Sequence, residues 1–358
     1  MSEEPAQTAR LKDVAARAGV SSTTASLILN DKTDAFPEQT VRRVKDAARQ
    51  LGYRPNRLAQ SLRRQRSHSI GLISDDIAST PFAGAMIRGA QEAAWKAGHV
   101  LLLIDTEGEA DVERAALETM LDRKVDGLVY ARMYHQVLEP PHPIGNVPLV
   151  MLDARAPDNS VSSVVPDESG GTRSAIEHLV ESGHTRIGFV QTLDEVQAAS
   201  ERLAAFRTTL ADAGLPGDDA PIAYDPLLPG STSADVVNML DGPDRPTAIF
   251  CFNDLTAHNV YKVARQLGHR IPQDLSVVGF DNQETVAPWL DPGLTTVQLP
   301  HYEMGRWAVE HLEQIIAGEA DEPVQFRMPC PLVIRDSVAL PSEERRGGNT
   351  MRRKEDDE

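Results

Sequence analysis

From residue 69 onward, short apolar runs alternate with helical stretches, and this alternation restricts the fold more than any other feature of the chain. The first series consists of the strands SIGLIS, VLLLID, DGLVY and PLVMLD, with helices near 82–97 and 110–123. A second series repeats the plan with the strands RIGFVQ, TAIFCFN and LSVVGFD, and with helices near 168–182, 197–213 and 254–268. Because strands that alternate with helices form parallel sheets, we expect a core of two doubly wound α/β subdomains.

Polar side chains stand at the predicted strand ends, where ligands bind in sheets of this type and where two facing subdomains leave a cleft. They are Asp75, Asp76, Asp153, Asn253, Asp254 and Asp281. Carboxylates and an amide around one cavity suit a hydroxyl-rich ligand such as a sugar, because each hydroxyl both donates and accepts. Each residue also has a structural interpretation, since Asp and Asn at strand ends often cap a helix or turn the chain.

Charge is distributed unevenly along the 358 residues, whose formal net charge is -17. Residues 1–67 hold 13 Lys and Arg against 7 Asp and Glu, whereas the remainder holds 23 against 46. A basic segment joined to an acidic body is typical of a nucleic-acid-binding module whose contact with phosphate stays local. The alternative is a solvated basic surface.

The basic segment carries the pattern of a helix-turn-helix. The first helix has one apolar face and stops at Gly19, where a tight turn favours a residue that tolerates positive φ. Ser21 is a suitable N-cap for a second helix over residues 22–29. A third helix begins at about Pro37 and ends at Gly52. The predicted inward residues are Leu11, Val14, Ala15, Ala18, Ala25, Ile28, Leu29, Val41, Val44, Ala48 and Leu51.

In a helix-turn-helix the second helix lies in the major groove, and its N-terminal side chains reach base edges. Ser22, Thr23 and Leu27 are the candidate readers, and Ser26 is also exposed on that helix. A three-helix module that binds another protein is the alternative for this segment.

Residues 53–66 carry five arginines and no acid, and they lead directly into the first core strand. Pro55 can open a helix with an apolar stripe of Leu58, Ala59 and Leu62, which is too short to be stable alone and should order only on a partner. Minor-groove proteins combine arginine contacts with an apolar wedge between base steps, and Leu62 beside Arg63 fits that role. A flexible solvated linker is the alternative.

Compartment and chemistry are limited by what the sequence lacks. Cys251 and Cys330 lie in apolar runs without CxxC spacing, which indicates buried thiols and a reducing compartment. The N-terminus does not read as a signal peptide, and no window approaches the ~20 apolar residues of a membrane span. We therefore expect a cytoplasmic protein that contacts no membrane.

Four segments together identify the chain as similar to the lactose/galactose repressor (LacI/GalR) family. They are LKDVAARAGVSSTTASLILN, LGYRPNRLAQSL, HLVESGHTRIGFV, and DLSVVGFDN followed by LTTVQLP, and the resemblance covers roughly residues 10–340. It implies a homodimer whose heads bind a palindromic operator of double-stranded DNA. It also implies a periplasmic-binding-protein-like core whose subdomain angle changes when a small-molecule effector binds, and repression as the outcome.

The resulting domain prediction places the helix-turn-helix at 1–54 and the hinge at 55–67. The core spans 68–342, with an N-subdomain at about 68–166 and 298–328 and a C-subdomain at about 167–297 and 329–342. The tail, 343–358, is expected to be disordered.

The resemblance assigns roles to individual residues. Leu62 matches the family's intercalating leucine, and Arg202, in ASERLAAF, matches its ligand-binding arginine. The predicted DNA-binding residues are Ser21, Ser22, Thr23, Ser26, Leu27, Asn30, Tyr53, Asn56, Arg57, Ala59, Leu62 and Arg63. The predicted effector-binding residues are Asp75, Phe82, Asp153, Arg202, Asn253, Asp281, His301 and Met304.

Three features of the sequence depart from the family pattern. Leu27 stands where many members have a polar or basic residue, and a leucine can contact a thymine methyl but cannot bond guanine in a bidentate way. The turn between Asn30 and Pro37 is slightly longer than in the lactose repressor. The tail has no apolar heptads for a tetramerising coiled coil, which favours a dimer.

Other functions remain as alternatives. An extracytoplasmic sugar-binding protein would share the two-lobed core, but it would need a signal peptide and no basic head. An enzyme is not indicated, because GxSxG, HExxH, P-loop and strand-following GxGxxG motifs are missing and His184 has a structural setting. We expect no cofactor and no metal. A helix-turn-helix activator is compatible with the sequence, because the sign of regulation depends on operator position.

Overall fold

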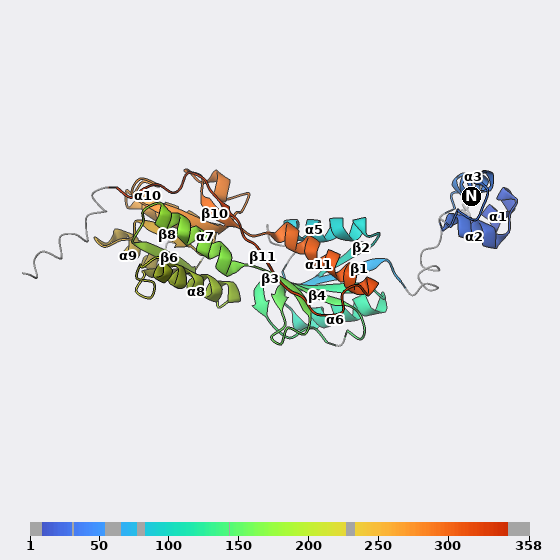
Figure 1. The fold of residues 1–358 in the computed structure, drawn as a ribbon, viewed down its shortest axis with the longest axis horizontal. Coiled ribbons are helices and arrows are strands. Elements are labelled where there is room, and N and C mark those ends of the chain that lie inside the picture. The colour runs from blue at the N-terminus through green and yellow to red at the C-terminus, as the bar shows by residue number, and fades with distance from the viewer. Residues whose placement is uncertain are drawn as a thin grey trace, which may run out of the picture. The chain divides into compact units, whose positions relative to one another are not determined.

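The computed structural model describes residues 9–30, 32–53, 66–76, 83–142, 144–226 and 233–342. The chain divides into two compact units, Met1–Ser67 and His68–Glu358, each considered by itself (Figure 1). The predicted disordered tail and most of the hinge lie outside the described residues.

The described residues of the first unit form three helices, α1 (Leu11–Ala18), α2 (Ser22–Leu29) and α3 (Glu38–Gln50). The chain turns after α1 at Gly19, whose φ of 64° is in the left-handed region that glycine adopts without strain. The core of the unit is apolar and includes the partly buried Phe36 from the turn before α3; its fully or largely buried members are Val14, Ala15, Ala18, Ala25, Ile28, Val44, Ala47 and Ala48. The helix-turn-helix prediction is confirmed in its elements and its inward residues.

The second unit begins with a parallel six-stranded sheet in the order β11-β5-β4-β3-β1-β2. Its strands are β1 (Ser69–Ser74), β2 (Val100–Asp105), β3 (Gly127–Val137), β4 (Leu149–Arg155), β5 (Ser162–Pro166) and β11 (Gln325–Met328). Helices α5 (Ala83–Lys96) and α11 (His301–Ala317) pack on one face, and α6 (Ala110–Asp122) packs on the other. This N-subdomain is therefore doubly wound, as predicted.

A second sheet of six strands has the order β12-β10-β9-β8-β6-β7. Its strands are β6 (Ile187–Thr192), β7 (Ile222–Asp225), β8 (Ala248–Cys251), β9 (Ser276–Asp281), β10 (Thr295–Gln298) and β12 (Leu332–Val333), of which only β12 is antiparallel to its neighbour. Helices α7 (Glu168–Glu181) and α8 (Gln197–Asp212) cover one face, and α9 (Ala234–Asp241) and α10 (Asp254–Gln266) cover the other. A 3₁₀ turn, η1 (Ala287–Trp289), follows β9. The prediction of two α/β subdomains is confirmed.

The chain passes between the two sheets after β5, after β10 and after β11. These crossings bring α11 back to the N-subdomain, where it packs closely against α5. Glycines permit the approach: a Cβ on Gly89 would lie 2.0 Å from the carbonyl oxygen of Tyr302, and one on Gly305 would lie 2.1 Å from that of Met86. The carboxyl ends of strands from both sheets border the crossings, and this is where the cavity described below is found.

Candidate functional site

The exposed side of α2 carries the predicted base-reading residues. Ser22 and Thr23 are exposed, and Leu27 is 36% exposed although it is apolar. An exposed leucine on an otherwise packed head is available for contact with a partner, whereas Ala25 and Ile28 on the same helix are buried.

Other predicted DNA-binding residues of the head hold α2 in place. The Ser21 hydroxyl accepts a hydrogen bond from the Thr24 amide at 3.1 Å and so caps the helix. At the other end, Asn30 Nδ2 donates to the Ser26 carbonyl at 2.6 Å. These residues hold the two ends of α2, and their predicted DNA contacts would come in addition to this role.

The hinge falls largely outside the described residues. Tyr53 is described: it packs against the apolar core of the head, and burial raises the pKa of its hydroxyl. The remaining predicted hinge contacts lie outside the description and are Asn56, Arg57, Ala59, Leu62 and Arg63.

A small cavity of about 20 Å³, roughly the space that holds one water molecule, lies among the strand ends of the core. It is lined from both subdomains and from the segments that join them. The lining residues are Met133, Tyr134, His135, Asp153, Pro166, Glu168, Ala198, Arg202, Phe252, Asn253, Asp281, Leu299 and His301. Five of the predicted effector-binding residues are therefore brought together: Asp153, Arg202, Asn253, Asp281 and His301.

Arg202 projects from α8 and is 2% exposed. Its Nε donates to Glu168 Oε2 at 2.6 Å, and its Nη1 donates to the Phe252 carbonyl. The guanidinium carbon lies 3.6 Å from the ring centroid of Phe280, so the cation also stacks on an aromatic face. The guanidinium is thus held rigidly against the wall of the cavity.

Asp153 and Asp281 both take positive φ, 53° and 104°, at the ends of β4 and β9. Such backbone conformations cost about 1–3 kcal/mol in a non-glycine residue and cluster at functional sites. Asp153 Oδ1 is buried and has no hydrogen-bond partner among the described residues. A strained backbone and an unsatisfied buried oxygen both mark Asp153 as a residue placed for something other than packing.

Burial sets the protonation of these carboxyls. It raises the pKa of Asp281 to about 8 against the lowering effect of Arg202, and it raises the pKa of Asp153 well above its ordinary value, with Glu168 adding to the effect. Burial therefore favours the protonated form of both carboxyls. Glu168 is paired with Arg202 at 2.6 Å, and Asp281 Oδ1 lies 3.9 Å from the same guanidinium.

The other predicted effector residues have different surroundings. The Asn253 side-chain oxygen accepts from the Thr256 amide at 2.9 Å and caps α10, so this residue lines the cavity and is also a helix cap. Asp75 Oδ1 accepts from the Met133 amide at 2.9 Å and does not line the cavity. Met304 is fully buried in the apolar core between α5, α11 and the sheet. Phe82 lies outside the described residues.

His135 lines the cavity and was not among the predicted residues. It is 1% exposed, neither of its ring nitrogens has a hydrogen-bond partner within the described part of the chain, and Glu201 Oε1 is 3.9 Å from Nδ1. Burial lowers its pKa to about 4, so the ring is neutral near pH 7. The sequence pattern ended the strand at Tyr130, but β3 continues past an irregularity between Ala131 and Gln136 and carries His135 into the cavity.

These features define a class of protein, a DNA-binding regulator that joins a helix-turn-helix head to a two-lobed core. Residues 10–56 match the lacI family of bacterial regulatory proteins, and residues 176–338 match a periplasmic binding protein-like domain. No described helix is long and apolar enough to cross a membrane.

Relatives extend the match over nearly the whole chain. The HTH-type transcriptional repressor PurR of Aliivibrio salmonicida is 33% identical over 332 residues, which cover 92% of this chain and 99% of that protein. A transcriptional regulator of the LacI family from Rhizobium etli is 36% identical with a TM-score of 0.71, and the match covers 76% of this chain and all of that one. The transcriptional regulator CelR in complex with cellobiose is 30% identical with a TM-score of 0.61, covering 92% of this chain and 99% of that one.

The chain therefore belongs to the lacI family of bacterial regulatory proteins. It is a DNA-binding transcriptional repressor and not an enzyme. The buried setting of His184 agrees with this, because its ring bonds Thr247 Oγ1 at 2.9 Å, Ser276 Oγ at 3.0 Å and the Ala339 carbonyl at 2.9 Å, and so serves as a structural link.

Proposed function

We propose that this repressor acts in the cytoplasm as a homodimer, binds a palindromic operator, and changes its operator affinity when an uncharged, hydroxyl-rich molecule such as a sugar or glycoside enters the core cavity. In this proposal the head spans 1–54, the hinge 55–67, and the effector-binding and dimerisation core 68–342, in the two subdomains set out above.

The observation that carries the ligand class is a set of buried polar groups without partners. Asp153 Oδ1 and both ring nitrogens of His135 belong to residues that line the cavity, and they make no hydrogen bonds with described residues. The cavity of about 20 Å³ admits a molecule of sugar size once the two subdomains move apart. A buried polar atom left unsatisfied costs about 1–3 kcal/mol, so a ligand that satisfies these atoms recovers that energy.

Protonation supports an uncharged ligand. Burial raises the pKa of Asp153 and Asp281 and so favours their uncharged form, while the neutral His135 ring offers one donor and one acceptor. The Arg202 guanidinium is already paired within the wall, because its Nε bonds Glu168 at 2.6 Å and its Nη1 lies 3.9 Å from Asp281 Oδ1. Ligand hydroxyls match these groups because each one donates and accepts, and the cellobiose complex of CelR is an example of a related core with such a ligand.

Recognition of DNA is proposed to rest on the exposed side of α2. Ser22 and Thr23 would bond base edges. Leu27 would contact a thymine methyl, because a leucine side chain cannot form hydrogen bonds with guanine. Leu62, outside the described residues, is proposed to enter the minor groove.

Selection from a random duplex library tests the operator proposal. The full-length chain should enrich a palindrome, and Leu62→Ala should weaken binding to that palindrome far more than binding to random DNA. Enrichment of non-palindromic sites would contradict the homodimer, and equal losses on both DNAs would contradict the wedge.

A thermal-shift screen of sugars, glycosides and nucleosides tests the ligand class. A hit should raise the unfolding temperature of the wild type, and Asp153→Asn should reduce that shift, because Asn replaces one carboxyl oxygen by an NH₂ group and alters the pattern of donors and acceptors. Asp122→Asn, an exposed carboxyl at the end of α6, is the matched control and should keep the full shift. Stabilisation by nucleosides alone would refute the sugar assignment, and equal shifts in both variants would remove Asp153 from the site.

A further inference from the structure

A second cluster of polar side chains lies at the amino ends of the strands of the N-subdomain sheet, whereas the cavity lies at the carboxyl ends. His68 directly precedes β1, His99 directly precedes β2, and Asp126 directly precedes β3. The order of these parallel strands is β3-β1-β2, and Ser69 pairs with Val100 while Ile70 pairs with Gly127. The register therefore places the three preceding residues side by side at the amino ends of adjacent strands.

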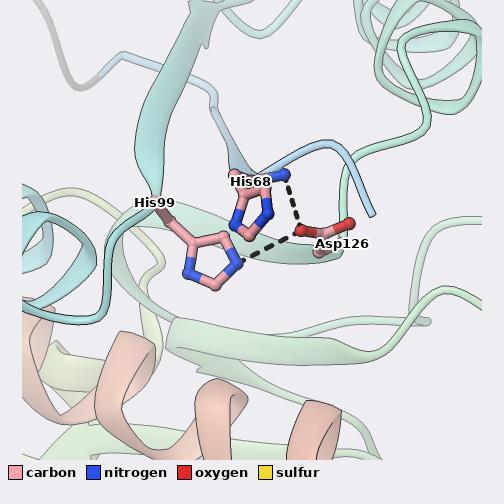
Figure 2. A group of neighbouring side chains, drawn as sticks. All are labelled: His68, His99 and Asp126. Atoms are coloured by element: carbon pink, nitrogen blue, oxygen red, sulfur yellow. Dashed lines mark hydrogen bonds and ion pairs between the residues drawn. The ribbon is translucent and has the colours of Figure 1, made fainter. Parts of the chain in front are cut away.

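The three side chains converge (Figure 2). One possible ligand atom from each of the three residues lies within 4.8 Å of those from the other two. His99 Nε2 is 3.2 Å from Asp126 Oδ2, and the same oxygen accepts the backbone amide of His68 at 2.8 Å. The centroids of the two imidazole rings are 5.8 Å apart.

His99 is enclosed between two carboxylates. Its Nδ1 lies 2.7 Å from Glu313 Oε1 on α11, and its Nε2 faces Asp126, while the His99 side chain is 6% exposed. A neutral imidazole carries one N–H, so it can donate to only one of the two carboxylates, and the other contact then brings a ring lone pair against a carboxylate oxygen. A cation at the Nε2 side removes this conflict.

We propose that this cluster binds a divalent metal ion of the zinc type through His68, His99 Nε2 and the Asp126 carboxylate. Two imidazoles and a carboxylate are a ligand set that zinc takes, with metal–ligand distances of about 2.0–2.2 Å. Ligands at those distances around a tetrahedral ion are about 3.3 Å apart, so the observed cluster must contract by about 1.5 Å at its widest. The exposed His68 side chain can supply that movement.

Glu313 has a defined part in this site. Ligating histidines commonly donate their second N–H to a carboxylate, which orients the ring and makes the ligating nitrogen more basic. Glu313 Oε1 lies 2.7 Å from Nδ1 of His99 but is not hydrogen-bonded to it here, so a small rotation of the ring would complete that donation. His68 is the first residue of the predicted core and directly follows the predicted hinge. An ion bound to His68 would therefore restrain the chain where the hinge meets the core.

The test uses tag-free, full-length protein stripped with a chelator and then titrated with Co²⁺ and Zn²⁺. One Co²⁺ per chain should produce the visible absorption bands of a four-coordinate ion without thiolate charge transfer, since Cys251 and Cys330 are buried elsewhere. Zn²⁺ should displace the cobalt and abolish the bands.

His68→Asn is the decisive variant, because His68 is exposed and its φ of 54° is one that asparagine tolerates. It should weaken metal binding at least about tenfold. His258→Gln, at an exposed histidine on α10, is the matched control and should bind as the wild type does. Equal affinity in all three proteins, or a wild type that takes up no metal, would overturn the proposal.

Discussion

Removing Arg202 should destabilise the core because the guanidinium is the partner of a buried carboxylate. Arg202 and Glu168 have side-chain exposures of 3% and 2%, and their contact is 2.6 Å long. Breaking such a pair from one side costs about 3–5 kcal/mol, since the remaining charge stays buried without compensation. We therefore expect Arg202→Ala to lower the free energy of unfolding of the core by about that amount.

Replacing both partners should cost less than the two single changes together. The double variant Arg202→Met, Glu168→Gln removes both charges of this pair, and contacting residues commonly show coupling energies of about 0.5–3 kcal/mol. The singles Arg202→Met and Glu168→Gln complete the cycle. We expect the double variant to lose less free energy of unfolding than the sum of the losses in the two single variants.

Urea unfolding followed by tryptophan fluorescence measures this cycle. Trp95, Trp289 and Trp307 all belong to the second unit, so the signal reports the core and not the head. Additive losses in the double variant would refute the argument that the pair is held by mutual compensation. A loss of effector response in Arg202→Ala then has to be compared with the double variant before it is assigned to a missing ligand contact.

Three further predictions concern packing, capping and pH. Gly305→Ala should lower the core's stability by about 1–3 kcal/mol, because its Cβ would lie 2.1 Å from the Met86 carbonyl oxygen. Gly84→Ala, which has open space around it, should be neutral or stabilising. Urea midpoints measure both variants, and equal midpoints would contradict the close helix contact. Ser21→Ala should cost the head about 0.5–2 kcal/mol in the melting of its far-ultraviolet dichroism, and an unchanged melt would show that the cap contributes nothing. Burial lowers the pKa of His184 to about 4 from 6.5, so the unfolded chain takes up the proton first, and the stability from this group is complete above pH 6.5 and declines towards pH 4. Urea midpoints measured between pH 7 and 5 should therefore fall less steeply in His184→Asn than in the wild type, and identical slopes would contradict the assignment.

The head could be predicted from sequence because its boundaries have local causes. Gly19 turns the chain, Ser21 caps α2, and Gly52 follows α3 with a φ of 62°. The long alternating segments of the core were predicted for the same reason. Short strands such as β11 and β12 were not predicted. They have four and two residues, contain no continuous apolar run, and form only by pairing with a neighbouring strand.

The cavity was only partly predictable. Asp153 and Asp281 reach the cavity from two different sheets, because each lies near the carboxyl end of its strand, β4 in the N-subdomain and β9 in the C-subdomain. The irregular extension of β3 that brings in His135 depends on Asp75 bonding the Met133 amide, a contact between segments far apart in sequence. Met304 was predicted to contact the effector, but its side chain packs into the apolar core of the N-subdomain instead.

The central claim is that a ligand of the core controls DNA binding by the head, and fluorescence anisotropy on the selected palindrome measures this most directly. The full-length protein should bind the palindrome with an affinity that a saturating hit from the ligand screen changes by about 5–150-fold, the usual range of coupling between two sites. The same dissociation constant with and without saturating ligand would contradict the account.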